Sequence, residues 1–149
     1  MKRIAVLVVV AAMALVMGTA GGALALGTAT VDVSATVVPF CTFNTNGALA
    51  FGFLDPSAPA DVNGVATQPT FICSPGTGFT IVDDNGVNGA HRMADGAGGF
   101  IPYSFTYTGT GVGNGLAMSM DIAGTVLGAD YATALPGIYT DVVTLTITP

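Results

Sequence analysis

The stretch TATVDVSATVV at residues 28–38 alternates apolar and polar side chains without a break. A period of two is the signature of a β-strand with one buried face. One face of this segment would be polar, formed by threonine, serine and aspartate. The other would be a stripe of small apolar residues, namely Ala29, Val31, Val33, Ala35 and Val37. We therefore predict a strand here.

The sequence pattern of the rest of the chain also predicts strands separated by tight turns. Short stretches rich in β-branched and aromatic residues are bounded by clusters of Pro, Gly, Asp and Asn. No stretch has a helical period, so the pattern predicts an all-β protein with a β-sandwich fold. The expected strands cover residues 48–54, 66–73, 78–82, 100–108, 116–126 and 138–148, with loops at 55–65 and 109–115. In the last strand, the residues expected to face the core are Val143, Leu145 and Ile147.

The N-terminus has the features of a secretory signal peptide. A positive pair precedes an uninterrupted apolar run over residues 4–17, and Ala23-Leu24-Ala25 fits the small-x-small pattern that signal peptidase recognises. A membrane anchor is the alternative, because no charge interrupts this region. The apolar run has only 14 residues, however, whereas a spanning helix needs about 20. We expect residues 1–25 to be removed and the mature protein to be secreted.

The charge balance of the mature chain is strongly acidic. One basic residue, Arg92, stands against nine acidic residues, all of them aspartate. A phosphate-binding surface needs several Lys or Arg side chains, so nucleic acids and anionic membranes are excluded as partners. The shortage of Lys, Glu and Arg also argues against long amphipathic helices, whose solvent face these residues usually form.

The chain contains two cysteines, Cys41 and Cys73, and both follow the expected cleavage site. In an oxidising compartment we expect one disulfide, which closes a loop of about 30 residues and is worth roughly 3–4 kcal/mol in the chain-entropy model. Two buried free thiols are the alternative. A metal site is not expected, because the chain has one histidine and no closely spaced cysteine pair.

No set of residues indicates catalysis. His91 is the single histidine, and no serine lies in a nucleophile-elbow context. The glycine-rich stretch 109–115 lacks the lysine of a phosphate-binding loop, and the acidic turn at 83–88 lacks calcium ligands at alternate positions. We therefore expect a protein that is not an enzyme and has no cofactor.

Two other functions stay open. A monomeric cell-surface carbohydrate-binding protein, or lectin, would use exposed aromatic rings such as Tyr103 and Tyr107. A divergent hydrolase would need a pocket that brings His91 together with two aspartates.

Beyond the alternating segment and Cys41, several short motifs follow one another along the mature chain. In chain order they are Leu49-Ala50-Phe51-Gly52, Asp55-Pro56, Phe71-Ile72-Cys73, Arg92-Met93, Ile101-Pro102-Tyr103 and the closing stretch 136–147. With this order and this cysteine spacing, the chain resembles the spore coat protein U domain family. Members of that family include the pilin subunits of archaic chaperone–usher pili.

The resemblance implies an incomplete immunoglobulin-like β-sandwich that lacks its final strand, which leaves an apolar groove open along a sheet edge. In such pilins a periplasmic chaperone first lends a strand. At the outer-membrane usher, the N-terminal extension of the next subunit then replaces it. The expected protein is thus a structural subunit of a fimbria or a spore-coat-type layer, which crosses the periplasm to the cell surface and partners with itself, a chaperone and an usher.

The resemblance also implies roles for the two alternating segments. The stripe from Ala29 to Val37 would be the donor strand, and Val143, Leu145 and Ile147 would line part of the acceptor groove. Burying three valines contributes on the order of 5–9 kcal/mol before ordering costs. The alternative is that residues 28–38 are the protein's own first strand, so donation in trans and pairing in cis both stay open. The expected organisation is a signal peptide at 1–25, a donor segment at 26–38 and a β-sandwich domain at 39–149.

Overall fold

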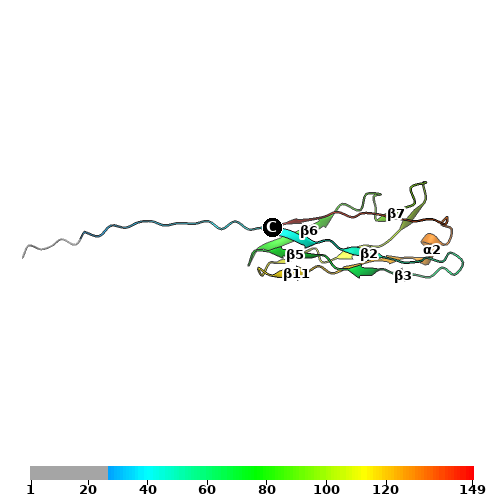
Figure 1. The fold of residues 1–149 in the computed structure, drawn as a ribbon, viewed down its shortest axis with the longest axis horizontal. Helices are drawn as coiled ribbons and strands as arrows, with labels where there is room; N and C mark the ends of the chain where they lie inside the picture. The colour runs from blue at the N-terminus through cyan, green and yellow to red at the C-terminus, as the bar shows by residue number, and fades with distance from the viewer. Residues whose placement is uncertain (1–26) are drawn as a thin grey trace, which may run out of the picture. The chain divides into compact units, whose positions relative to one another are not determined.

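The computed structural model describes residues 27–149. The predicted signal peptide, residues 1–25, lies outside the described residues. The chain divides into two units, Met1–Thr36 and Val37–Pro149. Strands and one short helix make up the second unit (Figure 1).

The secondary structure of the second unit consists mainly of short strands. In chain order the elements are β1 (Cys41–Thr45), β2 (Ala48–Ala50), β3 (Val62–Asn63), β4 (Val65–Thr67), β5 (Thr70–Cys73), β6 (Gly78–Asp83), β7 (Arg92–Ala94), β8 (Phe100–Pro102), β9 (Thr106–Tyr107), β10 (Thr110–Val112), β11 (Ala117–Ser119), β12 (Ile122–Ala123), β13 (Thr125–Val126), the helix α2 (Gly128–Tyr131) and β14 (Leu145–Thr148).

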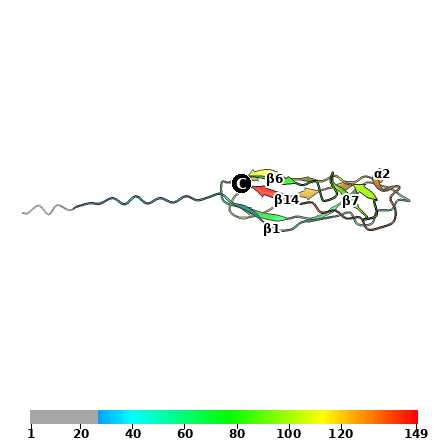
Figure 2. The same cartoon turned by 90° about the horizontal axis from the view of Figure 1, so that it is seen from above.

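Two three-stranded antiparallel sheets form one half of the Val37–Pro149 unit. Their strand orders are β1-β5-β11 and β10-β6-β14. Apolar side chains of both sheets meet in one buried cluster, where the rings of Phe71 in β5 and Phe79 in β6 lie 4.9 Å apart between centroids. The sheets therefore pack as the two layers of a β-sandwich, with β1 and β6 on opposite sides in Figure 2. This confirms the prediction of an all-β sandwich.

The other half of the unit, toward α2 in Figure 1, consists of the two-stranded ladders β12-β9, β13-β3, β2-β4 and β7-β8. Its core is formed by the buried side chains of Ile101, Val126 and Tyr131. The hydroxyl of Tyr131 donates to the carbonyl of Ala60 at 2.7 Å and accepts from its N–H at 2.9 Å, which ties the preceding loop to this core. Among residues 27–149, no helix has the length and apolar character needed to cross a membrane.

The strand predicted over residues 28–38 is not formed in the structure. These residues have no regular secondary structure, and the side chains of Val31 and Val33 are 83% and 89% exposed. An alternating segment is stabilised as a strand by ladder hydrogen bonds and by burial of one face on a sheet. No ladder among the described residues includes this segment, so its apolar stripe stays in solvent.

Several other elements differ from the sequence-based expectation. The glycine-rich stretch 109–115 was expected as a loop but contains β10, an edge strand that pairs with β6. Gly111 lies directly opposite Phe79. A Cβ at this position would lie 2.7 Å from the Phe79 ring, so the glycine lets β10 pair with β6 without displacing that ring. The expected strand 138–148 is regular only in β14, and α2 and β1 have no counterpart among the expected elements.

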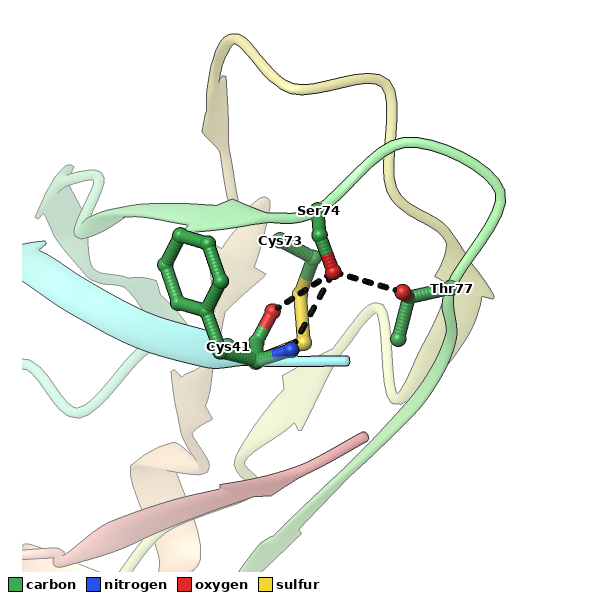
Figure 3. Close-up of a disulfide and its surroundings, with 5 residues drawn as sticks. Cys41, Cys73, Ser74 and Thr77 are labelled. Carbon is green, nitrogen blue, oxygen red and sulfur yellow. Dashed lines mark hydrogen bonds between the residues drawn. A yellow bond between two sulfur atoms is a disulfide. The ribbon is translucent and has the colours of Figure 1, made fainter. Parts of the chain in front are cut away.

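The predicted disulfide between Cys41 and Cys73 is present and joins directly opposed residues of β1 and β5 (Figure 3). The backbone of Phe40 extends this ladder by one pair, because its carbonyl accepts from the Ser74 N–H at 3.0 Å and its N–H donates to the Ser74 hydroxyl at 3.1 Å. The Ser74 hydroxyl also lies 2.7 Å from that of Thr77. Covalent and hydrogen bonds thus hold the start of β1 on β5.

Candidate functional site

A groove of about 690 Å³ runs along the Val37–Pro149 unit between two segments that are distant in sequence. One wall is formed by residues 43–51, in β1 and β2, and the other by residues 139–145, which lead into β14. The floor and walls are mainly apolar. The apolar side chains that line the groove belong to Phe43, Ala48, Leu49, Phe51, Pro69, Met93, Tyr103, Phe105, Ile122, Tyr139, Val142, Val143 and Leu145.

The first wall is an unpaired strand edge. β1 is the outermost strand of its sheet and pairs only with β5 among the strands of residues 27–149. Because Phe40 bonds to Ser74 on the β5 side, the alternation of an antiparallel ladder directs the N–H and C=O groups of Cys41 and Phe43 away from β5. These backbone groups are free to pair with a further strand.

The second wall is also an unpaired edge. β14 is the outermost strand of its sheet, and the carbonyls of Thr140, Val142 and Thr144 accept from N–H groups of Ala94, Val87 and Asp84 on one side. Consecutive residues of an extended strand direct their peptide groups to opposite sides. The odd-numbered residues between 141 and 147 therefore present their N–H and C=O groups to the other side.

The groove runs from one core cluster to the other. Phe43 and Leu145 pack against the cluster that contains Phe71, whereas Phe51 and Tyr139 pack against the cluster around Ile101. The two walls therefore run antiparallel to each other. A strand added between them would be parallel to one wall and antiparallel to the other.

The groove is narrow at the end formed by β1 and β14. These strands approach within 8 Å between Cα atoms but share no ladder. A strand that pairs with both edges needs about 10 Å between them, twice the usual spacing of roughly 4.8 Å. An added strand would therefore widen this end by a few ångströms.

A polar contact fixes the second wall at Asp141. Its Oδ2 accepts from the Tyr103 hydroxyl at 2.7 Å, and its Oδ1 accepts from the N–H and the side-chain amide of Asn88 at 3.3 and 3.1 Å. Burial of the Tyr103 ring, together with the bond to the Asp141 carboxylate, raises the pKa of this phenol well above its ordinary value. Tyr103 therefore acts as a neutral donor that holds the wall in place.

A second carboxylate, that of Asp84, holds the same wall at Thr144, three residues after Asp141. The Oδ1 atom of Asp84 accepts from the Thr144 N–H and from the Gly86 N–H, both at 2.9 Å. These bonds, first of all the one from Thr144, hold the pKa of Asp84 below its ordinary value of 3.8. Asp84 thus ties the loop after β6 to the strand that borders the groove.

We predict that Asp84→Asn makes the fold less sensitive to acid. A lowered folded-state pKa means that the ionised carboxylate contributes stability above pH 3.8, which is lost as the pH falls through the folded value. Asn lacks this titration, so the urea midpoint of the variant should start lower at pH 7 and decline less between pH 5 and pH 2 than that of the wild type. Asp121→Asn is the control, because the hydrogen bond that Asp121 accepts from the Thr108 N–H at 3.2 Å goes to its backbone carbonyl, which the substitution leaves in place. Parallel pH profiles for D84N and wild type would contradict the assignment.

His91 and the two tyrosines considered from sequence do not form a separate site. His91 lies outside the groove lining and pairs with Asp83 at 2.9 Å, with its ring between those of Tyr103 and Phe105. Tyr103 lines the groove, and Tyr107 is partly buried against the first core cluster. Among residues 27–149, no three His, Cys, Asp or Glu side chains are grouped as a metal site.

The structure places the residues of the predicted acceptor strand in two different environments. Val143 and Leu145 line the groove. Ile147 packs against the first core cluster with Leu145 but is not part of the lining. The side chains of the predicted donor stripe, Ala29, Val31, Val33, Ala35 and Val37, are all exposed.

Most of the groove was missed by sequence reasoning. The floor residues Phe105 and Ile122 and the wall residues Phe43, Leu49 and Phe51 come from four separate stretches of the chain. Their signal in the sequence is alternation within short strands, as in Cys41-Thr42-Phe43. That pattern shows which side chains face inward, but it does not show that one side of the core is left uncovered.

Comparison with known proteins gives one family match. The model of the family described as the Spore Coat Protein U domain matches residues 27–105, more than half of the chain. The comparison with curated proteins gave no match. Among solved structures, the chain is similar to the crystal structure of the CsuC–CsuE chaperone–tip adhesion subunit pre-assembly complex from archaic chaperone-usher Csu pili of Acinetobacter baumannii, at a TM-score of 0.40 and 19% identity. The alignment covers 75% of this chain and only 40% of the other, so this similarity is too distant to inform function.

Proposed function

The chain belongs to the Spore Coat Protein U domain family, and from this premise we propose that it is a secreted structural subunit of a surface polymer. The polymer is a fimbria or a spore-coat-type layer. Its subunits join by donor-strand exchange, in which the N-terminal segment of one copy fills the groove of another.

The groove supports the acceptor half of this proposal. It combines an apolar floor with two unpaired strand edges, one formed by β1 and the other by residues 139–147. Unpaired edges bind extended segments through main-chain hydrogen bonds, while alternate side chains fill pockets between the edges. A free edge of this kind also promotes aggregation, so a subunit in transit needs a protein that covers it. A periplasmic chaperone and an outer-membrane usher are therefore the proposed partners before the cell surface is reached.

The N-terminal segment supports the donor half. Residues 29–37 present a continuous apolar stripe of Val and Ala, and its three valines are between 83% and 89% exposed. Insertion of these valines into an apolar groove contributes on the order of 5–9 kcal/mol before ordering costs. The small residues would occupy shallow positions, Ala29 at the start of the stripe and Ala35 between Val33 and Val37.

The observation that carries the proposal is the coexistence of an open groove and an exposed alternating segment in one chain. We expect protein sheared from the cell surface to run on a denaturing gel as a ladder without boiling and as a single band after boiling. Strand-exchanged subunits unfold through a high barrier, so detergent alone leaves them joined. Samples with and without reductant serve as the control, because a ladder caused by intermolecular disulfides would vanish with reductant. A single band in every lane would overturn the proposal.

A further inference from the structure

Three residues, Val38-Pro39-Phe40, connect the alternating segment to β1, and we call them the linker. A subunit carries both a donor segment and an acceptor groove, so it competes with its neighbours for its own groove. A short flexible connection gives an effective concentration of about 1 mM, and a connection that cannot span the two sites gives nearly zero. The linker conformation therefore decides between self-completion and polymerisation.

The geometry of the first wall restricts how a chain can reach its own groove. The segment enters β1 directly at Cys41, so a donor from the same chain would have to turn back and lie antiparallel to β1. Directly opposed residues of an antiparallel pair face the same side. Cys41 packs toward the core, so a residue of the apolar stripe must stand opposite to it. The shortest arrangement places Val37 opposite Cys41 and uses the linker as a three-residue turn.

The linker is poorly suited to that turn at each of its positions. A three-residue hairpin loop uses a type I turn followed by a residue in the left-handed region, usually glycine. Val38 precedes a proline and is disfavoured in the helical conformation that the first position needs. Pro39 is disfavoured at the second position, and Phe40 would bring a bulky aromatic residue to the left-handed third position.

Phe40 is also held in an extended strand by its neighbours. Its carbonyl and N–H both bond to Ser74, and the disulfide at Cys41 and Cys73 joins the next pair of the same ladder, as Figure 3 shows for the labelled residues Cys41, Cys73, Ser74 and Thr77. A left-handed Phe40 would lose the bonds to Ser74. A five-residue loop with Ala35 opposite Cys41 would instead remove Val37 from the groove, which leaves two of the three valines.

We infer that the linker Val38-Pro39-Phe40 prevents the subunit from inserting its own alternating segment and thereby reserves the groove for the segment of a second copy. This inference rests on the proposed function. It assigns a specific role to residues that lie in neither the donor stripe nor the groove lining.

The test replaces the linker with a sequence that forms the turn. The variant V38P/P39D/F40G introduces Pro-Asp-Gly, a sequence with strong turn preference, and V38A/P39A/F40A is the matched control that removes the same side chains without a turn glycine. The mature chains, with the disulfide intact, are refolded at micromolar concentration and analysed by light scattering and by hydrogen exchange of residues 28–37.

We expect the wild type to form polymers whose amount rises with concentration. The alanine control should form more polymer than the turn variant, because a Cβ at the third position still disfavours the left-handed conformation. The turn variant should remain monomeric, with at least tenfold less polymer and with residues 28–37 protected from exchange. Addition of Val33→Asp to the turn variant should abolish that protection, which would show that the segment fills its own groove.

The outcomes separate the two proposals. If the turn variant polymerises to the wild-type level, the linker inference alone is overturned. The linker would then not decide between self-completion and polymerisation. The linker inference is also overturned if the wild type is a stable monomer in which residues 28–37 are protected from hydrogen exchange. If the wild-type protein forms no polymer and residues 28–37 exchange freely, the proposed function is overturned, and the linker inference with it.

Discussion

Replacement of Val33 by aspartate is expected to abolish polymer formation while leaving the recipient fold intact. Val33 is the central residue of the donor stripe, and its side chain is 89% exposed in the subunit, so the change leaves the core of the Val37–Pro149 unit untouched. In the polymer the same position would face the apolar groove. The variant loses about 1.5–3 kcal/mol of valine burial and brings an unpaired carboxylate into an apolar site, at a cost of several kcal/mol.

The matched control for this prediction is Ser34→Asp. Ser34 lies on the polar face of the same segment, so the added charge remains in solvent when the strand is inserted. Sedimentation or gel-ladder analysis should show polymers for S34D and none for V33D. Because V33D retains its groove, it should also shorten wild-type polymers when mixed in as a minor component. Polymers of normal length from V33D alone would refute the donor assignment.

Removal of the disulfide by C41S/C73S is expected to lower the free energy of unfolding by about 3–4 kcal/mol. The bond links residues separated by 32 positions, so it restricts the unfolded chain over a long loop. It also fixes β1, the first wall of the groove, to β5. With an m-value of about 1–3 kcal/mol/M, the urea midpoint should fall by about 1–4 M.

Reduced wild-type protein is the control for the disulfide variant. It should unfold at the same urea concentration as C41S/C73S, because both lack the covalent bond. Ser74→Ala tests the neighbouring hydrogen bonds separately and should cost about 1 kcal/mol, the usual worth of a single bond. An unchanged midpoint for C41S/C73S would show that hydrogen bonding alone holds β1.

Sequence patterns were most reliable where the signal is local. The alternation in the last strand correctly indicated that Leu145 and Ile147 face the core. The predicted export and the presence of two cysteines led to the expectation of a disulfide, which the structure contains. The same reasoning predicted a strand at 28–38, which the structure does not form. Alternation predicts that a segment can form a strand when it pairs with a free sheet edge. It does not predict which sheet edge is free or whether it belongs to the same chain.

The glycine-rich stretch shows a second limit of local reasoning. Residues 109–115 have the composition of a loop, yet β10 forms there because Gly111 passes over the ring of Phe79. The role of such a glycine depends on a residue more than thirty positions earlier in the chain. No property of the glycine-rich stretch taken alone indicates this contact.

The amino-acid order of this protein is sufficient to predict an all-β chain, an apolar stripe near its N-terminus and one disulfide. These features depend on composition, periodicity and compartment, all of which act over short distances along the chain. The groove arises only on folding, when residues 43–51 and 139–145 come to border the same core and the outer edges of β1 and β14 stay unpaired. Pairing of strands distant in sequence leaves those edges free, and long-range pairing has no local signature in either segment.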